Sequence, residues 1–167
     1  MIDPDILKQT GSVFSSLSSD ITLSVVRNSD DARSAEFSAF VEDIASVSDR
    51  IKTVSRKGER FSFSILRNGK ATGISFRGIP NGHEFTSLLL AILNADGQGK
   101  NLPDEAVAAR IKALKGEIRL RTYVSLSCTN CPDVVQALNV MALVNPRISH
   151  EMVDGGLYQD EIERLGI

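Results

Sequence analysis

The chain has 167 residues and is 42% hydrophobic, which suits one ordinary domain or two small ones. Its formal net charge of −2 argues against binding nucleic acid regardless of base sequence, because such binding needs a basic face. No stretch nears the roughly 18 consecutive apolar residues of a transmembrane helix. The opening residues MIDPDILKQTGSVF also lack the pattern of a secretory signal, so we expect a cytoplasmic protein.

The first half predicts alternating helices and strands, followed by a hairpin and a buried helix. In chain order these are a helix over 2–17, a strand over 21–26, a helix over 29–47 that starts with capping residues, a strand over 50–54, strands over 61–66 and 71–76, and a helix over 81–93. Asn68-Gly69 between the last two strands is a strong hairpin signal. The polar, glycine-rich stretch 94–101 reads as a linker.

The second half restarts the alternation after this linker. We expect a helix over 102–114, a strand over 118–124, a helix that opens in the segment with both cysteines and runs to about Val144, a strand over 148–153, and the start of another helix over 157–167. Between the last two elements, Asp154-Gly155-Gly156 predicts a turn that needs a positive φ.

The second half repeats the first at a shift of 97 residues without gaps. Under this shift Ile21 falls on Ile118, Ile44 on Met141, and Arg50-Ile51 on Arg147-Ile148. Such agreement indicates an internal duplication, with one unit over 1–97 and the other over 98–167.

The two predicted units differ in chemistry and in length. Cys128 falls on Asp31 and Cys131 on Ser34, and the residues of the first copy read as helix-capping and first-turn residues. The first copy continues with a hairpin and a helix, whose counterparts would extend beyond Ile167. We therefore expect an incomplete second unit and a chain that is a fragment of a longer protein.

The sequence Cys128-Thr129-Asn130-Cys131-Pro132 has the pattern of a redox dithiol. The strand before it would deliver Cys128 to the edge of the sheet, and the N-terminal end of the following helix would stabilise its thiolate. Cys128 would then be the exposed attacking thiol and Cys131 the buried resolving one. Two reduced core cysteines and half of a zinc site are the alternatives, although neither His83 nor His150 stands at ligand spacing from the cysteines.

Two stretches carry a resemblance to a known family: TYVSLSCTNCPDVVQALNVMALVNPRISHEMVDGG and GHEFTSLLLAIL. They resemble the N-terminal domain of the flavoprotein subunit of alkyl hydroperoxide reductase, which reduces a bacterial peroxiredoxin. The resemblance is strong over 82–165 and looser before residue 80. It implies an α/β fold of two tandem thioredoxin-like folds, the first without redox cysteines and the second truncated at its C-terminal end.

The resemblance also implies an electron route and its partners. Electrons would pass from NAD(P)H through FAD and a dithiol in a C-terminal flavoprotein portion to Cys128–Cys131. They would then pass to a peroxiredoxin, the other subunit of alkyl hydroperoxide reductase, which reduces alkyl hydroperoxides. The full-length protein would be a homodimer. FAD and NAD(P)H would bind outside this chain, which contains no G-x-G-x-x-G.

The match at GHEFTSL further implies that Glu84 acts beside the dithiol. A nearby carboxylate would raise a thiol pKa and exchange a proton during disulfide exchange. Alternatively, Glu84 simply favours the first turn of its helix. Thioredoxin-like folds also place a cis-proline opposite the dithiol; Phe61 stands at this position in the first copy, and the second copy would reach it beyond Ile167.

Two other functions stay open at the level of sequence. One is a general thioredoxin- or glutaredoxin-like disulfide oxidoreductase with a broad range of substrates. The other is a non-enzymatic scaffold that docks a partner, in which the cysteines are incidental. Arg119 and Arg121 alternate along their strand and read as a solvated face, or as a contact for an acidic partner.

Overall fold

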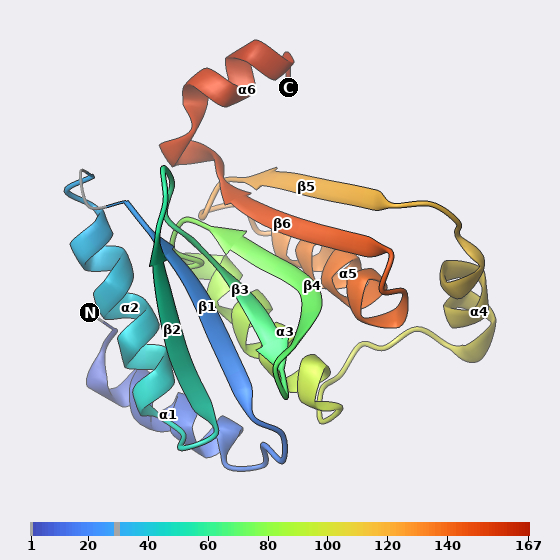
Figure 1. Cartoon of the computed structure of the whole chain (residues 1–167), viewed down its shortest axis with the longest axis horizontal. Helices are drawn as coiled ribbons and strands as arrows, with labels where there is room; N and C mark the ends of the chain where they lie inside the picture. Colours follow the sequence, from blue (N-terminus) through green and yellow to red (C-terminus); the bar gives the residue numbers. More distant parts are fainter. Residues whose placement is uncertain (1, 29–30) are drawn as a thin grey trace.

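The structure is a computed structural model that describes residues 2–28 and 31–167 (Figure 1). It is a mixed α/β fold built on one six-stranded sheet in the order β2-β1-β3-β4-β6-β5. The predicted α/β class is therefore confirmed. No helix in the described part of the chain is both long and apolar enough to cross a bilayer.

The first half contains every element that the sequence predicts. These are α1 (Pro4–Phe14), β1 (Ile21–Arg27), α2 (Ser34–Ser46), β2 (Ile51–Lys57), β3 (Ser62–Arg67), β4 (Lys70–Arg77), the 3₁₀ turn η1 (Gly82–Glu84) and α3 (Phe85–Asp96). Asn68 and Gly69 both have positive φ, as a two-residue hairpin turn requires. Their backbone joins β3 to β4 as antiparallel neighbours.

Two boundaries in the first half differ from the prediction. α2 begins at Ser34 instead of residue 29, because the Asp31 carboxylate accepts the Arg33 N–H and forms a turn before the helix. The expected capping residues Ser29 and Asp30 lie outside the described residues. α3 continues to Asp96, and the linker starts only at Gly97, whose φ of +86° caps the helix.

The second half contains α4 (Glu105–Ala113), β5 (Ile118–Val124), α5 (Cys131–Val144), β6 (Ile148–Asp154), the 3₁₀ turn η2 (Gly155–Leu157) and α6 (Gln159–Leu165). The expectation of a positive φ at Gly155 or Gly156 is wrong. Instead the Asp154 carboxylate accepts the Gly156 N–H and starts η2. A Cβ at Gly155 would lie 3.0 Å from the carbonyl oxygen of Val124, so close packing explains this glycine.

The two halves repeat each other in three dimensions. β1 and β2 are parallel and pair Ile21 with Ile51, while β5 and β6 are parallel and pair Ile118 with Ile148, each partner lying 97 residues further on. The helices between these strands begin at Ser34 and Cys131, again 97 residues apart. The repeat is thus present in strand register, while the division of the chain at residues 97 and 98 stays a prediction.

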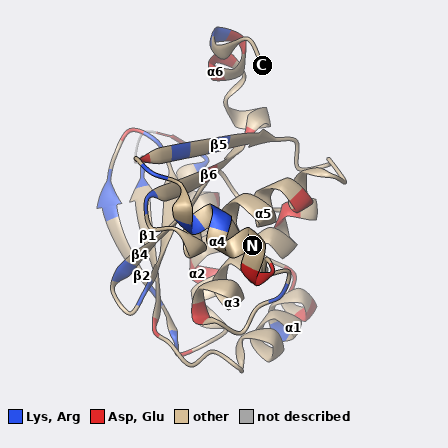
Figure 2. Ribbon diagram, turned by 90° about the vertical axis from the view of Figure 1, so that its right-hand side faces the viewer, with Lys and Arg blue, Asp and Glu red and all other residues tan. Residues whose placement is uncertain are grey.

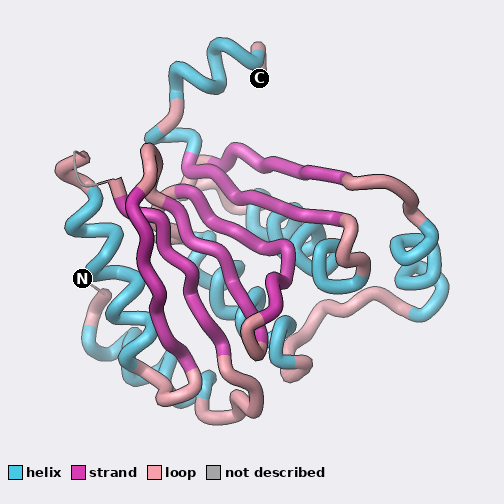
Figure 3. The backbone as a smooth tube through the Cα atoms, in the orientation of Figure 1, coloured by secondary structure: helices cyan, strands magenta, loops and turns pink. Residues whose placement is uncertain are grey.

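A parallel pairing between β4 and β6 joins the halves into one sheet, from Ile74 opposite His150 to Arg77 opposite Val153. α3 and α5 lie side by side behind this junction (Figures 1 and 3). Buried aromatic side chains fill the space between the sheet and the helices of the first half, among them Phe14, Phe37, Phe61, Phe63 and Phe76. β2 and β5 are the edge strands, and both carry basic residues (Figure 2).

Candidate functional site

Both cysteines lie where edge strand β5 passes into α5. Cys128 stands in the loop over 125–130, Cys131 is the first residue of α5, and a disulfide joins them with the Cα atoms 5.5 Å apart. The reduced core pair that the sequence left open is therefore not the state in this structure. Strand β5 does deliver the cysteines to the edge of the sheet, as predicted.

The start of α5 provides a donor to the first sulfur. The Cys131 backbone N–H donates a hydrogen bond to Cys128 Sγ over 3.1 Å. Pro132 occupies the first turn, where its missing N–H costs no helical hydrogen bond. Because helix N-terminal N–H groups favour a thiolate, this contact would lower the pKa of Cys128 in the reduced chain.

The burial of the two cysteines differs less than the sequence led us to expect. Both are half-buried, so Cys128 is not fully exposed and Cys131 is not fully buried. Cys131 packs against the hydrophobic core, whereas Cys128 lies outside it. This asymmetry has the predicted direction, and the roles of attacking and resolving thiol stay a prediction.

Glu84 is a fully buried carboxyl group at the end of η1. Neither of its carboxyl oxygens has a hydrogen-bond partner of good geometry within residues 2–28 and 31–167. Burial raises the pKa of Glu84 above its ordinary value, while Ser87 and His83 act weakly in the opposite direction. A group in this setting holds its proton more readily than an exposed glutamate does.

The turn that carries Glu84 packs directly on the loop that carries Cys128. The His83 N–H donates to the Leu126 carbonyl oxygen over 3.3 Å. Gly82 has a φ of +56°, and a Cβ there would lie 2.7 Å from the same oxygen, so only glycine allows this approach. The structure thus brings η1 and the cysteine loop together, as the resemblance implies, although the catalytic role of Glu84 is not tested by this proximity.

A buried polar trio connects the three elements around the cysteines. His150 of β6 lies 2.7 Å from Asn139 Oδ1 of α5 through Nδ1, and 2.9 Å from Thr122 Oγ1 of β5 through Nε2. Burial lowers the pKa of His150 to about 4. Sequence reasoning missed this trio, although the inward alternation of β6 at Ile148, His150 and Met152 was a signal for a buried histidine.

The zinc alternative finds no support at these residues. No group of three or more His, Cys, Asp or Glu side chains that could hold a metal ion occurs in the described part of the chain. His150 already uses both ring nitrogens within the trio, and the two sulfurs are bonded to each other.

A second polar cluster, also absent from the sequence analysis, surrounds Glu161 of α6. Its carboxylate accepts hydrogen bonds from the side chains of Arg60, Arg77, Arg121 and Tyr123 over 2.6–3.3 Å. Hydrogen bonds from Arg77 and Tyr123 lower the pKa of Glu161 to about 2. Arg77 is itself buried, so this cluster holds the last helix against both halves of the sheet.

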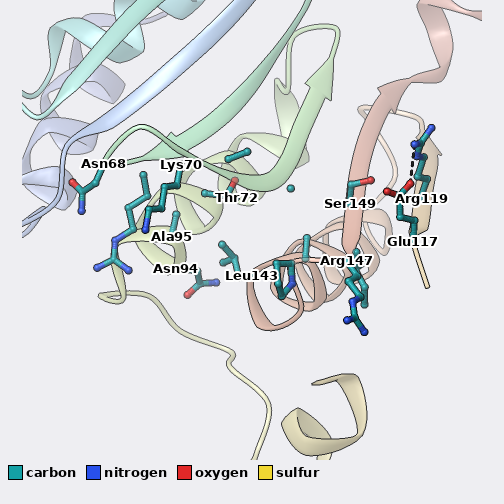
Figure 4. A pocket seen from close by; sticks show the side chains of 16 residues that line it. Asn68, Lys70, Thr72, Asn94, Ala95, Glu117, Arg119, Leu143, Arg147 and Ser149 are labelled. Atoms are coloured by element: carbon teal, nitrogen blue, oxygen red, sulfur yellow. Dashed lines mark hydrogen bonds and ion pairs between the residues drawn. The ribbon is translucent and has the colours of Figure 1, made fainter. Parts of the chain in front are cut away.

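A cleft of about 760 Å³ opens at the end of α5 remote from the cysteines (Figure 4). It lies between the β3–β4 hairpin, the C-terminal ends of α3 and α5, and the start of β6. Lys70 and Arg147 line it, whereas neither cysteine nor Glu84 does. The chemistry of the dithiol is therefore not carried out in this cleft.

The residues of this chain do not fit FAD or NAD(P)H, the cofactors that the resemblance implies for the longer protein. The one G-x-G, at Gly97 and Gly99, is followed by Leu102 where a dinucleotide fold needs a third glycine. Gly97 moreover ends α3, instead of preceding a helix whose N-terminus could receive a pyrophosphate. The chemistry available to this chain itself is therefore that of its dithiol.

Comparisons with known proteins place this site in context. No protein-family model matches the chain. A protein named NADH dehydrogenase from Ferdinandcohnia aciditolerans is 43% identical over 168 residues, which cover 100% of this chain and 32% of that protein. The AhpF protein of alkyl hydroperoxide reductase from Pseudomonas aeruginosa is 46% identical over 142 residues, covering 83% of this chain and 27% of the relative. The chain thus spans about a third of the length of these curated relatives.

Solved structures share the fold. The NTD_N/C domain of the alkyl hydroperoxide reductase AhpF from Enterococcus faecalis has a TM-score of 0.89 at 29% identity, covering 100% of this chain and 86% of that one. A protein disulfide oxidoreductase from Aeropyrum pernix has a TM-score of 0.84 at 19% identity, covering 98% and 80%, and at this identity the likeness concerns the fold alone.

Proposed function

We propose that this chain, which is homologous to the N-terminal part of the alkyl hydroperoxide reductase AhpF, is a thiol–disulfide electron-transfer module. The observation that carries the proposal is the Cys128–Cys131 disulfide at the start of α5, with the Cys131 N–H directed at Cys128 Sγ. A disulfide placed at a helix N-terminus can be opened by an attacking thiolate and closed again by its own second thiol.

In the receiving half-reaction, a thiolate of a donor dithiol attacks Cys128 Sγ and forms a mixed disulfide. The Cys128–Cys131 bond breaks, and Cys131 leaves as a thiolate that takes up a proton. The second donor thiolate then attacks the donor sulfur of the mixed disulfide and releases reduced Cys128. The donor dithiol is oxidised to a disulfide, and two electrons now reside in this chain.

In the delivering half-reaction, the Cys128 thiolate attacks the disulfide of the acceptor and displaces one acceptor thiolate. Cys131 resolves the resulting mixed disulfide and frees the second acceptor thiol. Cys128 is the attacking residue because it lies outside the core, whereas Cys131 packs against the core.

Glu84 is proposed as the proton carrier of both half-reactions. Its raised pKa favours the protonated form, and its turn lies on the loop over 125–130. A protonated carboxyl group can supply the proton that the leaving thiolate needs, and the resulting carboxylate can take a proton back from the next attacking thiol.

The homology extends the proposal to the longer protein. The donor is a dithiol in a C-terminal flavoprotein portion that uses FAD and NAD(P)H, and the acceptor is the peroxiredoxin that reduces alkyl hydroperoxides. The full-length protein is proposed to be a cytoplasmic homodimer. No partnership with nucleic acid or membrane is included, and the net charge of −2 agrees with this.

The test is disulfide exchange between the reduced chain and an oxidised peroxiredoxin, with oxidised insulin chains as a general disulfide substrate. We expect Cys128→Ser to abolish exchange, and Cys131→Ser to stop it at a stable mixed disulfide that is visible by intact mass. Ser127→Ala, next to the attacking cysteine, is the matched control and should retain the parent rate.

Two results would contradict the proposal. Equal rates with peroxiredoxin and insulin would favour a general thioredoxin-like oxidoreductase. Full activity of the double Cys→Ser variant in the complete system would leave only a docking scaffold.

A further inference from the structure

We propose that Thr122, His150 and Asn139 are positioning residues that hold the two chain arms of the dithiol together when the disulfide is open. This inference rests on the proposed function. The arm before the cysteines is β5, which carries Thr122, and the arm after them is α5, which carries Asn139. His150 of β6 contacts both arms.

The trio is the buried polar bridge between these arms. Thr122 lies six residues before Cys128, and Asn139 lies eight residues after Cys131. The link between the arms runs through the imidazole ring, over 2.9 Å to Thr122 and 2.7 Å to Asn139. The trio therefore closes a non-covalent loop around the same segment that the disulfide closes covalently.

The geometry assigns the protons of the ring. Asn139 Oδ1 can only accept, so His150 Nδ1 carries the hydrogen and donates to it. Nε2 then accepts from the Thr122 hydroxyl. The neutral ring is the form that satisfies both contacts, and burial, which lowers the pKa of His150, maintains that form at neutral pH.

Asn139 is oriented by this one contact. It is buried, and its Nδ2 has no hydrogen-bond partner within residues 2–28 and 31–167. A buried amide with an unpaired N–H lowers the stability of the fold, so packing alone would favour an apolar residue here. Its oxygen nevertheless holds the His150 ring, which supports a role in positioning α5.

The consequence concerns the equilibrium between the dithiol and the disulfide. Reduction removes the covalent link between Cys128 and Cys131, and the thiols then stay close only if other contacts hold their arms. A well-held pair has a high effective concentration and re-forms its disulfide more readily. Weakening the trio should therefore favour the dithiol and make the chain a stronger oxidant.

The experiment equilibrates the whole 167-residue chain with glutathione buffers and traps thiols by alkylation. The reaction converts the chain disulfide and two glutathione molecules into the chain dithiol and one glutathione disulfide. For Thr122→Val, which keeps the shape and removes the hydroxyl, we expect the equilibrium constant for reduction to rise about threefold to tenfold. This corresponds to a potential about 14 to 30 mV less negative.

Three further variants separate positioning from general loss of stability. Thr122→Ser restores the hydroxyl and should return the constant to the parent value. Asn139→Leu removes the other contact and should shift it in the same direction as Thr122→Val. Asn145→Ala is the matched control, because this buried residue binds the Ile111 and Leu114 carbonyl oxygens at the other end of α5. It should lose stability without moving the constant.

The possible outcomes are distinct. A parent constant for Thr122→Val and Asn139→Leu, or an equal shift for Asn145→Ala, would overturn the positioning role while leaving the proposed function intact. A parent chain that exchanges with glutathione at no ratio would defeat the proposed function, and the positioning role with it.

Discussion

Glu84 is the residue whose setting most directly links stability to chemistry. The folded state favours its neutral form, because burial raises its pKa and no hydrogen bond of good geometry from the described residues offsets this. The contribution of this group to stability is therefore full below its unfolded pKa, near the ordinary value of 4.5, and is lost as pH rises through the raised folded pKa.

We predict that Glu84→Gln stabilises the chain at pH 7 by about 1 to 3 kcal/mol, because the substitution removes the cost of a buried, unpaired acid. It should also slow disulfide exchange with the peroxiredoxin, because the amide cannot carry a proton. Urea unfolding between pH 4 and pH 8 measures the first effect, and Glu163→Gln, at an exposed position, is the control. Parent-like stability at every pH would show that the carboxyl group is solvated.

At the residue scale, sequence reasoning finds what is adjacent in sequence and misses what folding brings together. The spacing of Cys128 and Cys131 and their place after a strand predict the disulfide segment correctly. The contact of His150 with Asn139 and Thr122 could not be predicted, because residues 11 and 28 positions apart meet only once the sheet and α5 are assembled.

At the scale of elements, α6 shows how a short helix depends on tertiary contacts. It has seven residues, too few for stability in isolation. Its link to the sheet is Glu161, which accepts from Arg77 over 2.7 Å and from Tyr123 over 2.6 Å. Removing one member of a buried ion pair leaves the other charged and unpaired.

We predict that Glu161→Gln lowers the free energy of unfolding by about 3 kcal/mol and releases α6 from the sheet. Hydrogen exchange over residues 159–165 should accelerate, while exchange in β1 should follow only the change in global stability. Asp160→Asn, an exposed neighbour on the same helix, is the control and should change neither quantity by much. Unchanged protection of α6 in Glu161→Gln would assign its docking to apolar contacts.

Element boundaries were predictable where hydrophobic alternation sets them. β5 has the predicted bounds, and β6 differs by one residue, because inward and outward side chains alternate along both strands. Helix ends depend on local hydrogen bonds instead. The late start of α2 follows from the contact of Asp31 with the Arg33 N–H, a contact that composition alone does not reveal.

At the scale of the molecule, the parallel pairing of β4 with β6 makes one sheet from two repeated halves. Gly73 permits this junction: it has a φ of +81°, and a Cβ there would lie 2.7 Å from the Ile148 carbonyl oxygen. The sequence predicted the repeat but not this pairing, because the internal comparison shows only what the halves share and not where they meet.

We predict that Gly73→Ala destabilises the chain by clearly more than Gly69→Ala. Both glycines have φ near +80°, so each alanine carries the same backbone cost of about 1 kcal/mol, but no described atom lies within 4 Å of a Cβ at Gly69. The excess for Gly73→Ala, about 1 to 3 kcal/mol by comparison with overpacking in cores, reports the clash at the junction. Equal midpoints of urea unfolding for the two variants would mean that the junction yields without strain.

The charges on β2 and β5 have a consequence for the behaviour of the chain at high concentration. Each edge strand presents unpaired backbone N–H and C=O groups along one side, which is a template for adding a strand from another molecule. Lys52, Arg56 and Lys57 follow β2, and Arg119 and Arg121 follow β5. Two copies that approach edge to edge therefore bring like charges together, and this repulsion opposes aggregation of the sheet.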